Sequence, residues 1–201
     1  MPGPTSLRSR AEGAPGIRST TSSIARAKRP RCGLVVERLE AEIQPRTASD
    51  VDSDFIGQYL LSHFPGVHPV SAWGETSFFY NPQHALPRGI YFATIKTKDG
   101  EHDRVSRLDR AGVFRLNLGI SKSSYCALFG PPPSRPPAGG VVQTGHDFTA
   151  LDTLTPHPVY GWMSWVSVLN PSKTTFEAIE PLLAESHTLA IGKFARRTGR
   201  R

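Results

Sequence analysis

A chain of 201 residues has room for one domain of ordinary size with additional tail. Its net charge of +7 lies at the two ends: residues 1–48 carry +5, residues 191–201 carry +5, and residues 49–190 carry −3. The middle of the chain is mildly acidic, which excludes net charge as an argument for nucleic-acid binding by the domain itself.

Residues 1–49 are rich in Arg, Ser, Thr, Pro and Gly and have little apolar periodicity. Such a segment buries too little apolar surface to offset its ordering entropy, so we expect a disordered basic extension. Three origins stay open: an organelle transit peptide, a basic arm, or translation from a start codon assigned too far upstream. We favour the third, because regular patterning begins only near Asp52.

The expected compartment is the cytoplasm. No apolar stretch approaches the roughly 18 to 20 residues that span a bilayer, and the N-terminus lacks the apolar core of a secretory signal. Cys32 and Cys126 form neither a metal-ligand spacing nor a disulfide framework, which suits a reducing compartment.

One helix and four strands are predicted in the first half of the domain. Asp52 or Ser53 can cap a short amphipathic helix that Pro65 and Gly66 end. Apolar and β-branched runs bounded by Gly, Asn, Pro and Asp then predict the strands. The predicted ranges are Asp52–Phe64 for the helix and Val67–Trp73, Thr76–Tyr80, Tyr91–Lys98 and Val113–Ile120 for the strands.

The second half adds two helices, a loop and one strand. Ser121 caps a predicted helix that ends at Phe129, and residues 130–145 form a Pro-rich loop that is a stiff surface segment or a PxxP ligand. The apolar run Trp162–Leu169 predicts an interior strand with both faces buried. A last helix begins at Thr174 in a capping-box pattern, and Pro181 must kink or restart it.

This order predicts an α+β fold. The strands follow one another without crossover helices, so we expect a mainly antiparallel sheet of about five strands with helices packed on one face. We expect a single domain over residues 50–195 and a basic C-terminal tail over residues 196–201.

Familiar catalytic signatures are missing. The chain has no G-x-S-x-G elbow, phosphate loop, dinucleotide fingerprint or H-E-x-x-H motif, and no recognisable metal-ligand spacing, so we predict no metal and can name no cofactor.

Two predicted strands place polar groups together on one face of the sheet. If Phe114, Leu116 and Leu118 face the core, then Arg115 and Asn117 face the other side. The same alternation, with Tyr91, Ala93 and Ile95 inward, turns Phe92, Thr94, Lys96 and Lys98 outward. These side chains form either a platform for an anionic ligand or a solvated face that keeps the protein soluble. The candidate ligand-binding residues are Lys96, Lys98, Arg115, Asn117 and Phe92.

A second candidate site lies beside the Pro-rich loop. Here His146 and His157 could do acid–base work, and Glu75 could be a carboxylate at a cleft or the partner of Lys96 or Arg115 across the sheet. The alternative is that His157 is held in a Pro-His-Pro turn for conformational reasons and that His146 caps a short helix.

Several of these segments together resemble the small bacterial proteins catalogued as domain of unknown function 6194. The resemblance covers roughly Asp54 to Ala190 and implies no established activity. It is carried by Trp73-Gly74-Glu75, Phe92-Ala93-Thr94-Ile95, Leu108-Asp109-Arg110, Gly112 to Gly119, Leu128-Phe129-Gly130, Pro156 to Tyr160 and Asn170-Pro171.

The element order is also similar, more weakly, to the YjbR-like double-wing proteins of frataxin-type fold, some of which are labelled DNA-binding. The first functional hypothesis is a non-catalytic module whose open sheet face takes an anionic small molecule, nucleic acid or a protein partner. The alternative is a small hydrolase or transferase that uses Glu75, His146 or His157. A third possibility is DNA binding through the basic ends alone.

Overall fold

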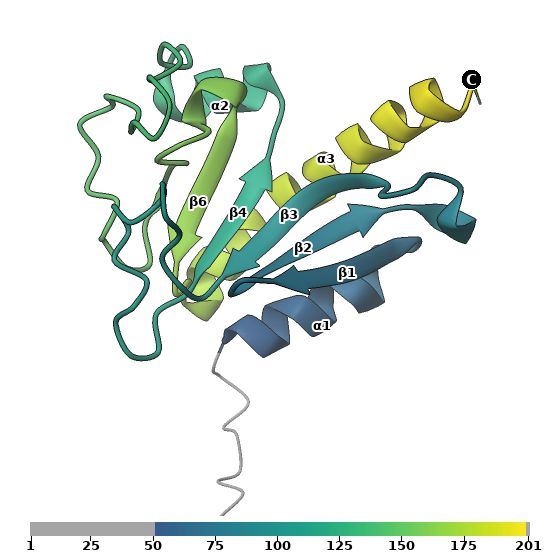
Figure 1. Cartoon of the computed structure of the whole chain (residues 1–201), viewed down its shortest axis with the longest axis horizontal. Helices are drawn as coiled ribbons and strands as arrows, with labels where there is room; N and C mark the ends of the chain where they lie inside the picture. Colours follow the sequence, from purple (N-terminus) through teal and green to yellow (C-terminus); the bar gives the residue numbers. More distant parts are fainter. Residues whose placement is uncertain (1–50, 200–201) are drawn as a thin grey trace, which may run out of the picture. The chain divides into compact units, whose positions relative to one another are not determined.

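A computed structural model describes residues 51–199 and has the predicted α+β architecture (Figure 1). Its open sheet has six strands in the order β1-β2-β3-β4-β6-β5, and every neighbouring pair is antiparallel. The predicted N-terminal extension and the last two residues of the predicted tail lie outside the described residues. The elements are α1 (Ser53–His63), β1 (Val67–Ala72), β2 (Glu75–Tyr80), η1 (Pro82–His84), β3 (Ile90–Lys96), β4 (Arg115–Gly119), α2 (Lys122–Phe129), β5 (Leu154–Pro156), η2 (Gly161–Met163), β6 (Trp165–Leu169) and α3 (Lys173–Thr198).

The helices α1 and α3 cover one face of this sheet, and α3 crosses behind the strands in Figure 1. Ile56 of α1 and Leu183 of α3 are fully buried in one core with Leu116 of β4. The opposite face carries the β3–β4 loop (residues 97–114) and residues 157–164, and we call it the loop face. The loop face leaves polar side chains of the sheet open to a ligand, whereas α1 and α3 pack on the other face.

Local hydrogen bonds start α1 and α2 as the sequence predicts. The carboxylate of Asp52 accepts from the backbone N–H of Phe55 at 2.7 Å, and the hydroxyl of Ser121 accepts from Ser124 N–H at 3.0 Å. For α3 the predicted cap is wrong by two residues, because Ser172 is the cap and accepts from Thr175 N–H at 3.2 Å. The Ser172 hydroxyl satisfies the free N–H group of Thr175, whereas a cap at Thr174 would have satisfied that of Glu177.

The helix α3 is longer than expected. It continues without a break through the exposed Pro181 and through Arg196 to Thr198, past the predicted end of the domain at residue 195. Leu183, Ala190 and Phe194, which follow the proline, are buried in the core. Packing of this stripe on the sheet holds the helix together across the hydrogen bond that proline cannot make.

A β-bulge in β3 reverses the predicted orientation of its first residues. Phe78 of β2 pairs with Ala93, and Phe79, the following residue, pairs with Tyr91. Phe92 between them has no partner on β2 and is an extra residue on β3. Phe92 is 2% exposed and lies in the core under the helices, whereas Tyr91 is 49% exposed. The predictions that Phe92 faces outward and Tyr91 inward are wrong, because a bulge shifts the alternation by one residue. Beyond the bulge, Ala93 and Ile95 face the core as predicted.

The last strand begins later than predicted. Gly161–Met163 form the short helix η2, Ser164 takes a left-handed conformation with φ 60°, and β6 begins at Trp165. Ahead of this turn, β5 pairs with β6 as a sixth strand. A three-residue strand leaves no periodic signal in a sequence. The chain between β5 and β6 therefore turns over the loop face instead of running straight into the sheet.

Candidate ligand-binding site

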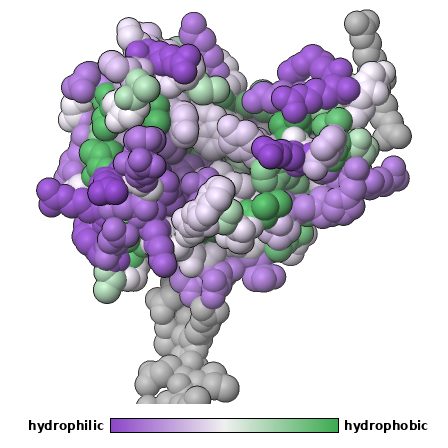
Figure 2. Space-filling model, in the orientation of Figure 1, coloured by the Kyte–Doolittle hydropathy of each residue, from purple (hydrophilic) through white to green (hydrophobic). Residues whose placement is uncertain are grey.

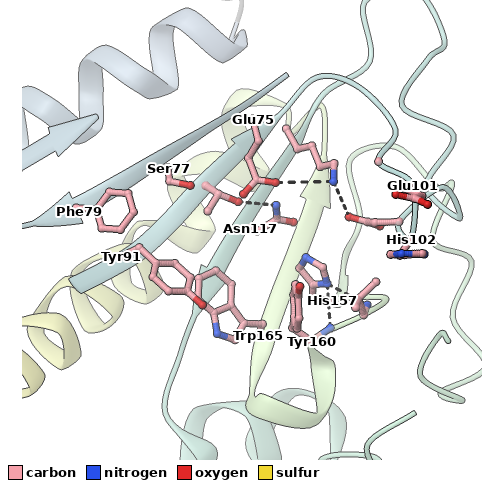
Figure 3. A pocket seen from close by; sticks show the side chains of 15 residues that line it. Glu75, Ser77, Phe79, Tyr91, Glu101, His102, Asn117, His157, Tyr160 and Trp165 are labelled. Atoms are coloured by element: carbon pink, nitrogen blue, oxygen red, sulfur yellow. Dashed lines mark hydrogen bonds and ion pairs between the residues drawn. The ribbon is translucent and has the colours of Figure 1, made fainter. Parts of the chain in front are cut away.

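The loop face contains a cavity of about 450 Å³. Its floor is formed by β2, β3, β4 and β6, and its walls are residues 100–103 of the β3–β4 loop and residues 157–160 (Figure 3). In Figure 2 hydrophilic residues gather over the loops at the left of this face, and the surface over the sheet is mixed. The lining residues are Glu75, Ser77, Phe79, Tyr91, Thr94, Lys96, Gly100, Glu101, His102, Asp103, Asn117, His157, Val159, Tyr160 and Trp165.

Aromatic rings form one side of the cavity. The ring of Tyr91 lies 5.3 Å from that of Trp165 and 5.9 Å from that of Phe79, measured between centroids. Gly119 makes room for the indole, because a Cβ at this position would stand 2.9 Å from Cε2 of Trp165. The bulge in β3 contributes Tyr91 to this wall, and the glycine lets Trp165 lie flat against β4.

Arg115 fastens the β3–β4 loop to the sheet from beneath the cavity. Its guanidinium is fully buried and binds both carboxylate oxygens of Asp103, at 3.1 and 2.5 Å. It also donates to Ser106 Oγ and to Asn117 Oδ1, each at 2.8 Å. These contacts use four of the five N–H groups that arginine possesses. Arg115 therefore anchors the wall of the cavity and does not reach into it.

Asp103 is the shared counter-ion of two cations on adjacent strands. Lys96 and Arg115 are direct cross-strand neighbours, and two like charges at such positions destabilise a pair of strands. The Lys96 ammonium lies 3.1 Å from Asp103 Oδ2 and 3.8 Å from Glu75 Oε2. Burial alone would raise the pKa of the Asp103 carboxyl, but the hydrogen bonds and charge of Arg115 outweigh it and hold that pKa well below its usual range.

Asn117 completes the floor of the cavity. Its amide oxygen accepts from Arg115, and its amide nitrogen donates to Thr94 Oγ1 at 2.8 Å. This pairing leaves the Thr94 hydroxyl hydrogen and the second amide hydrogen of Asn117 available on a floor that both residues line.

His157 lies in a wall of the cavity and is 3% exposed. Its Nδ1 accepts from the backbone N–H of Val159 at 3.0 Å and from that of Tyr160 at 3.1 Å. Its Nε2 lies 3.4 Å from Nη2 of Arg115. Burial and the Arg115 charge lower the pKa of His157 well below its ordinary value, so the ring is neutral.

The structure brings four of the predicted site residues to this cavity, namely Glu75, Lys96, Asn117 and His157. Arg115 lies beneath it, and Phe92 is buried on the far side of the sheet. Lys98 follows the end of β3, is exposed and lies along Gly74. His146 packs against the ring of Phe129 and is not among the lining residues. Glu75 and Lys96 are cross-strand partners, one of the two roles considered for Glu75.

Sequence reasoning missed Asp103, Ser106 and the aromatic wall. One signal was present, because two cations on neighbouring strands require a nearby carboxylate if one of them is buried. The sequence alone does not indicate which acidic residue supplies this carboxylate. The Pro-rich loop runs behind the His157 wall, where Val142 N–H donates to the carbonyl of Pro158 at 2.8 Å. Among residues 51–199, no group of three or more His, Cys, Asp or Glu is placed to hold a metal ion.

These features define an α+β domain with an open antiparallel sheet, helices on one face and a cavity on the other. The chain belongs to the Family of unknown function (DUF6194), whose model matches residues 51–199. No curated protein and no solved structure matches the chain. The resemblance seen in the sequence is thereby confirmed for this family, and the double-wing similarity stays a prediction. Within the described part of the chain, no helix is long and apolar enough to cross a membrane.

Proposed function

We propose that the domain is a non-catalytic binding module that takes a small molecule into the cavity on the loop face. The observation that carries this proposal is the division of one cavity into two halves. Tyr91 and Trp165 offer ring surfaces on one side, and Lys96, Asn117 and His157 offer hydrogen-bond donors on the other. A concave site with apolar walls and a few convergent polar groups is typical of small-molecule sites.

The size and charge of the cavity favour a small molecule over a nucleic acid. A volume of about 450 Å³ is enough for a ligand of moderate size. The two cations at the site, Lys96 and Arg115, are both bound to Asp103, and Glu75 and Glu101 add negative charge. A phosphate backbone needs unpaired Lys and Arg side chains, so the charge of the cavity disfavours nucleic acid. The size of the cavity favours a small molecule over a large protein partner.

The alternative of a Glu/His hydrolase or transferase is weaker for a chemical reason. A neutral imidazole that accepts hydrogen bonds at Nδ1 carries its proton on Nε2. His157 therefore has no free lone pair with which to remove a proton from a nucleophile. Glu75 shares the cavity, but it then lacks the histidine partner that this mechanism requires.

A thermal-shift screen of the full chain against ring-containing acids, amides and amines tests the proposal. A ligand at about 100 times its dissociation constant should add about 2.7 kcal/mol to the free energy of unfolding. The Tyr91→Ala variant should lose most of this shift, because it removes the ring between Phe79 and Trp165. Leu128→Ala is the matched control, since Leu128 is similarly exposed on α2 and does not line the cavity.

Two results would contradict the proposal. One is a screen in which no small molecule stabilises the chain. The other is a ligand whose shift is equal in wild-type protein and Tyr91→Ala, because that ligand would be binding elsewhere.

A further inference from the structure

We propose that His157 is the oxygen-binding group of the cavity: a neutral imidazole whose Nε2–H donates to a carboxylate or carbonyl oxygen of a ring-containing ligand. This inference rests on the proposed function and specifies the ligand class.

The turn between β5 and β6 determines which ring nitrogen carries the proton. Two backbone N–H groups, of Val159 and Tyr160, point at Nδ1 from 3.0 and 3.1 Å. A nitrogen that accepts two hydrogen bonds cannot itself carry a hydrogen, so the neutral ring is protonated at Nε2. The structure itself thus selects the tautomer, because both donors belong to the backbone and cannot rotate away.

Among residues 51–199, no acceptor is placed to receive that hydrogen in a hydrogen bond. Nη2 of Arg115, which lies 3.4 Å from Nε2, is itself a donor, so the two cannot bond to each other. The charged groups that act on the ring are Arg115 from β4, Asp103 from the β3–β4 loop and Lys96 from β3. Burial and the two cations oppose a charge on the imidazole, so the ring offers a neutral N–H donor.

Two aromatic rings, of Tyr160 and Trp165, lie close to the imidazole of His157. The centroid of the His157 ring lies 5.0 Å from that of Tyr160 and 6.5 Å from that of Trp165. A ligand oxygen at Nε2–H therefore lies about one ring width from surfaces on which a flat group can stack. Aryl carboxylates and aryl amides combine both features, whereas an aryl ammonium presents only donors to a donor.

Three probes of equal size test this ligand class on the full chain: benzoate, benzamide and benzylamine. Nitrogen NMR of the histidine side chains should show His157 protonated at Nε2 alone from pH 8 to pH 6. Benzoate and benzamide should shift its Nε2–H signal together with signals of Tyr91 and Trp165, and benzylamine should not. A proton on Nδ1, a doubly protonated ring at pH 6, or stronger binding of benzylamine would overturn the inference.

Two substitutions distinguish the two roles of His157, namely the Nε2–H that donates to the ligand and the Nδ1 that accepts from the backbone of the turn. In His157→Asn, the amide oxygen can still accept from the N–H group two residues on, as asparagine does in turns, but nothing replaces Nε2–H. In His157→Gln, the amide can reach the Nε2 position, but the turn loses its acceptor. We expect benzoate binding to weaken about tenfold in His157→Asn with little change in melting temperature. His157→Gln should melt lower and keep more of the binding.

The outcomes distinguish this inference from the proposed function. Benzoate that binds His157→Asn as tightly as wild type, while still shifting Tyr91 and Trp165, overturns the role of His157 and leaves the cavity as a binding site. If neither benzoate nor benzamide shifts these signals but another compound in the thermal-shift screen does, the ligand class is wrong and the binding function stands.

Discussion

Arg115 is the residue on which the geometry of the cavity most depends. The sequence around Arg115, between Phe114 and Leu116, does not indicate a buried guanidinium, yet this side chain is fully buried and four of its five N–H groups are hydrogen-bonded. It holds Asp103 and Ser106, which belong to a loop with little regular structure. A bidentate pair of this kind has a fixed geometry that lysine could not reproduce. Arg115 therefore fixes the loop wall to the strand beneath it.

Replacement of this arginine should be strongly destabilising. We expect Arg115→Met to lower the free energy of unfolding by about 3 kcal/mol, because Asp103 would be left buried with only Lys96 as a partner. Urea denaturation measures the change. Arg88→Met, at an exposed position, is the control and should alter stability by no more than about 0.5 kcal/mol.

The double variant Arg115→Met with Asp103→Leu should recover part of the loss, since it leaves no unpaired carboxylate. Equal stability of Arg115→Met and Arg88→Met would show that the buried guanidinium has no structural role.

At the scale of elements, the bulge in β3 decides which aromatic residue belongs to the core and which to the cavity. Without it, Phe92 would face the loops and Tyr91 the helices. With it, Phe92 packs against Phe64 and His187 at ring distances of 5.8 and 5.4 Å. One inserted residue thus supplies both a core ring and a binding ring from consecutive positions.

Alanine substitutions at these two neighbours measure the effect of the bulge. Phe92→Ala should cost about 3 to 5 kcal/mol, because it opens a cavity in the core. Tyr91→Ala should cost about 1 kcal/mol, because half of this side chain is already exposed. Chemical denaturation of both variants would contradict the bulge if Tyr91→Ala were the more damaging of the two.

At the scale of the whole molecule, buried histidines make the fold sensitive to acid. His187 lies in a box of rings formed with Phe64, Tyr80 and Phe92, at 4.9, 5.2 and 5.4 Å. Burial lowers the pKa of His187, as burial and Arg115 lower the pKa of His157. Because the folded state keeps both rings neutral, the unfolded chain binds more protons below about pH 6.5, and acid favours unfolding.

The free energy of unfolding should therefore be nearly constant above pH 7. Below about pH 6.5 it should fall by up to about 1.4 kcal/mol per histidine for each pH unit, until the pKa of the folded state is reached. A further loss is expected below about pH 4, because the pKa of Asp103 is held below its usual range and its paired carboxylate must then be protonated.

Urea denaturation between pH 7.5 and 5.5 checks this dependence. His187→Met should reduce the fall, and His63→Gln, at an exposed position, should leave it unchanged. A free energy of unfolding that stays constant over this range would contradict the burial of neutral rings.

Much of the architecture was predictable because it follows from local properties of the chain. The alternation around Leu116 and Leu118 places one side of β4 in the core, and Arg115 and Asn117 lie on the other side as predicted. Caps such as Asp52 join residues three positions apart. Element type, strand order in the chain and the polar character of one face could therefore be inferred from the sequence.

The sequence by itself thus determined an α+β domain with a polar face, and only the tertiary structure decided how that face is used. The carboxylate that neutralises Arg115 lies twelve residues away in the chain, and the imidazole beside it lies 42 residues away. The bulge that exposes Tyr91 exists only in the pairing of β2 with β3. Long-range pairing and register leave no periodic trace in a sequence, because they depend on which segments meet and not on the pattern within any one of them.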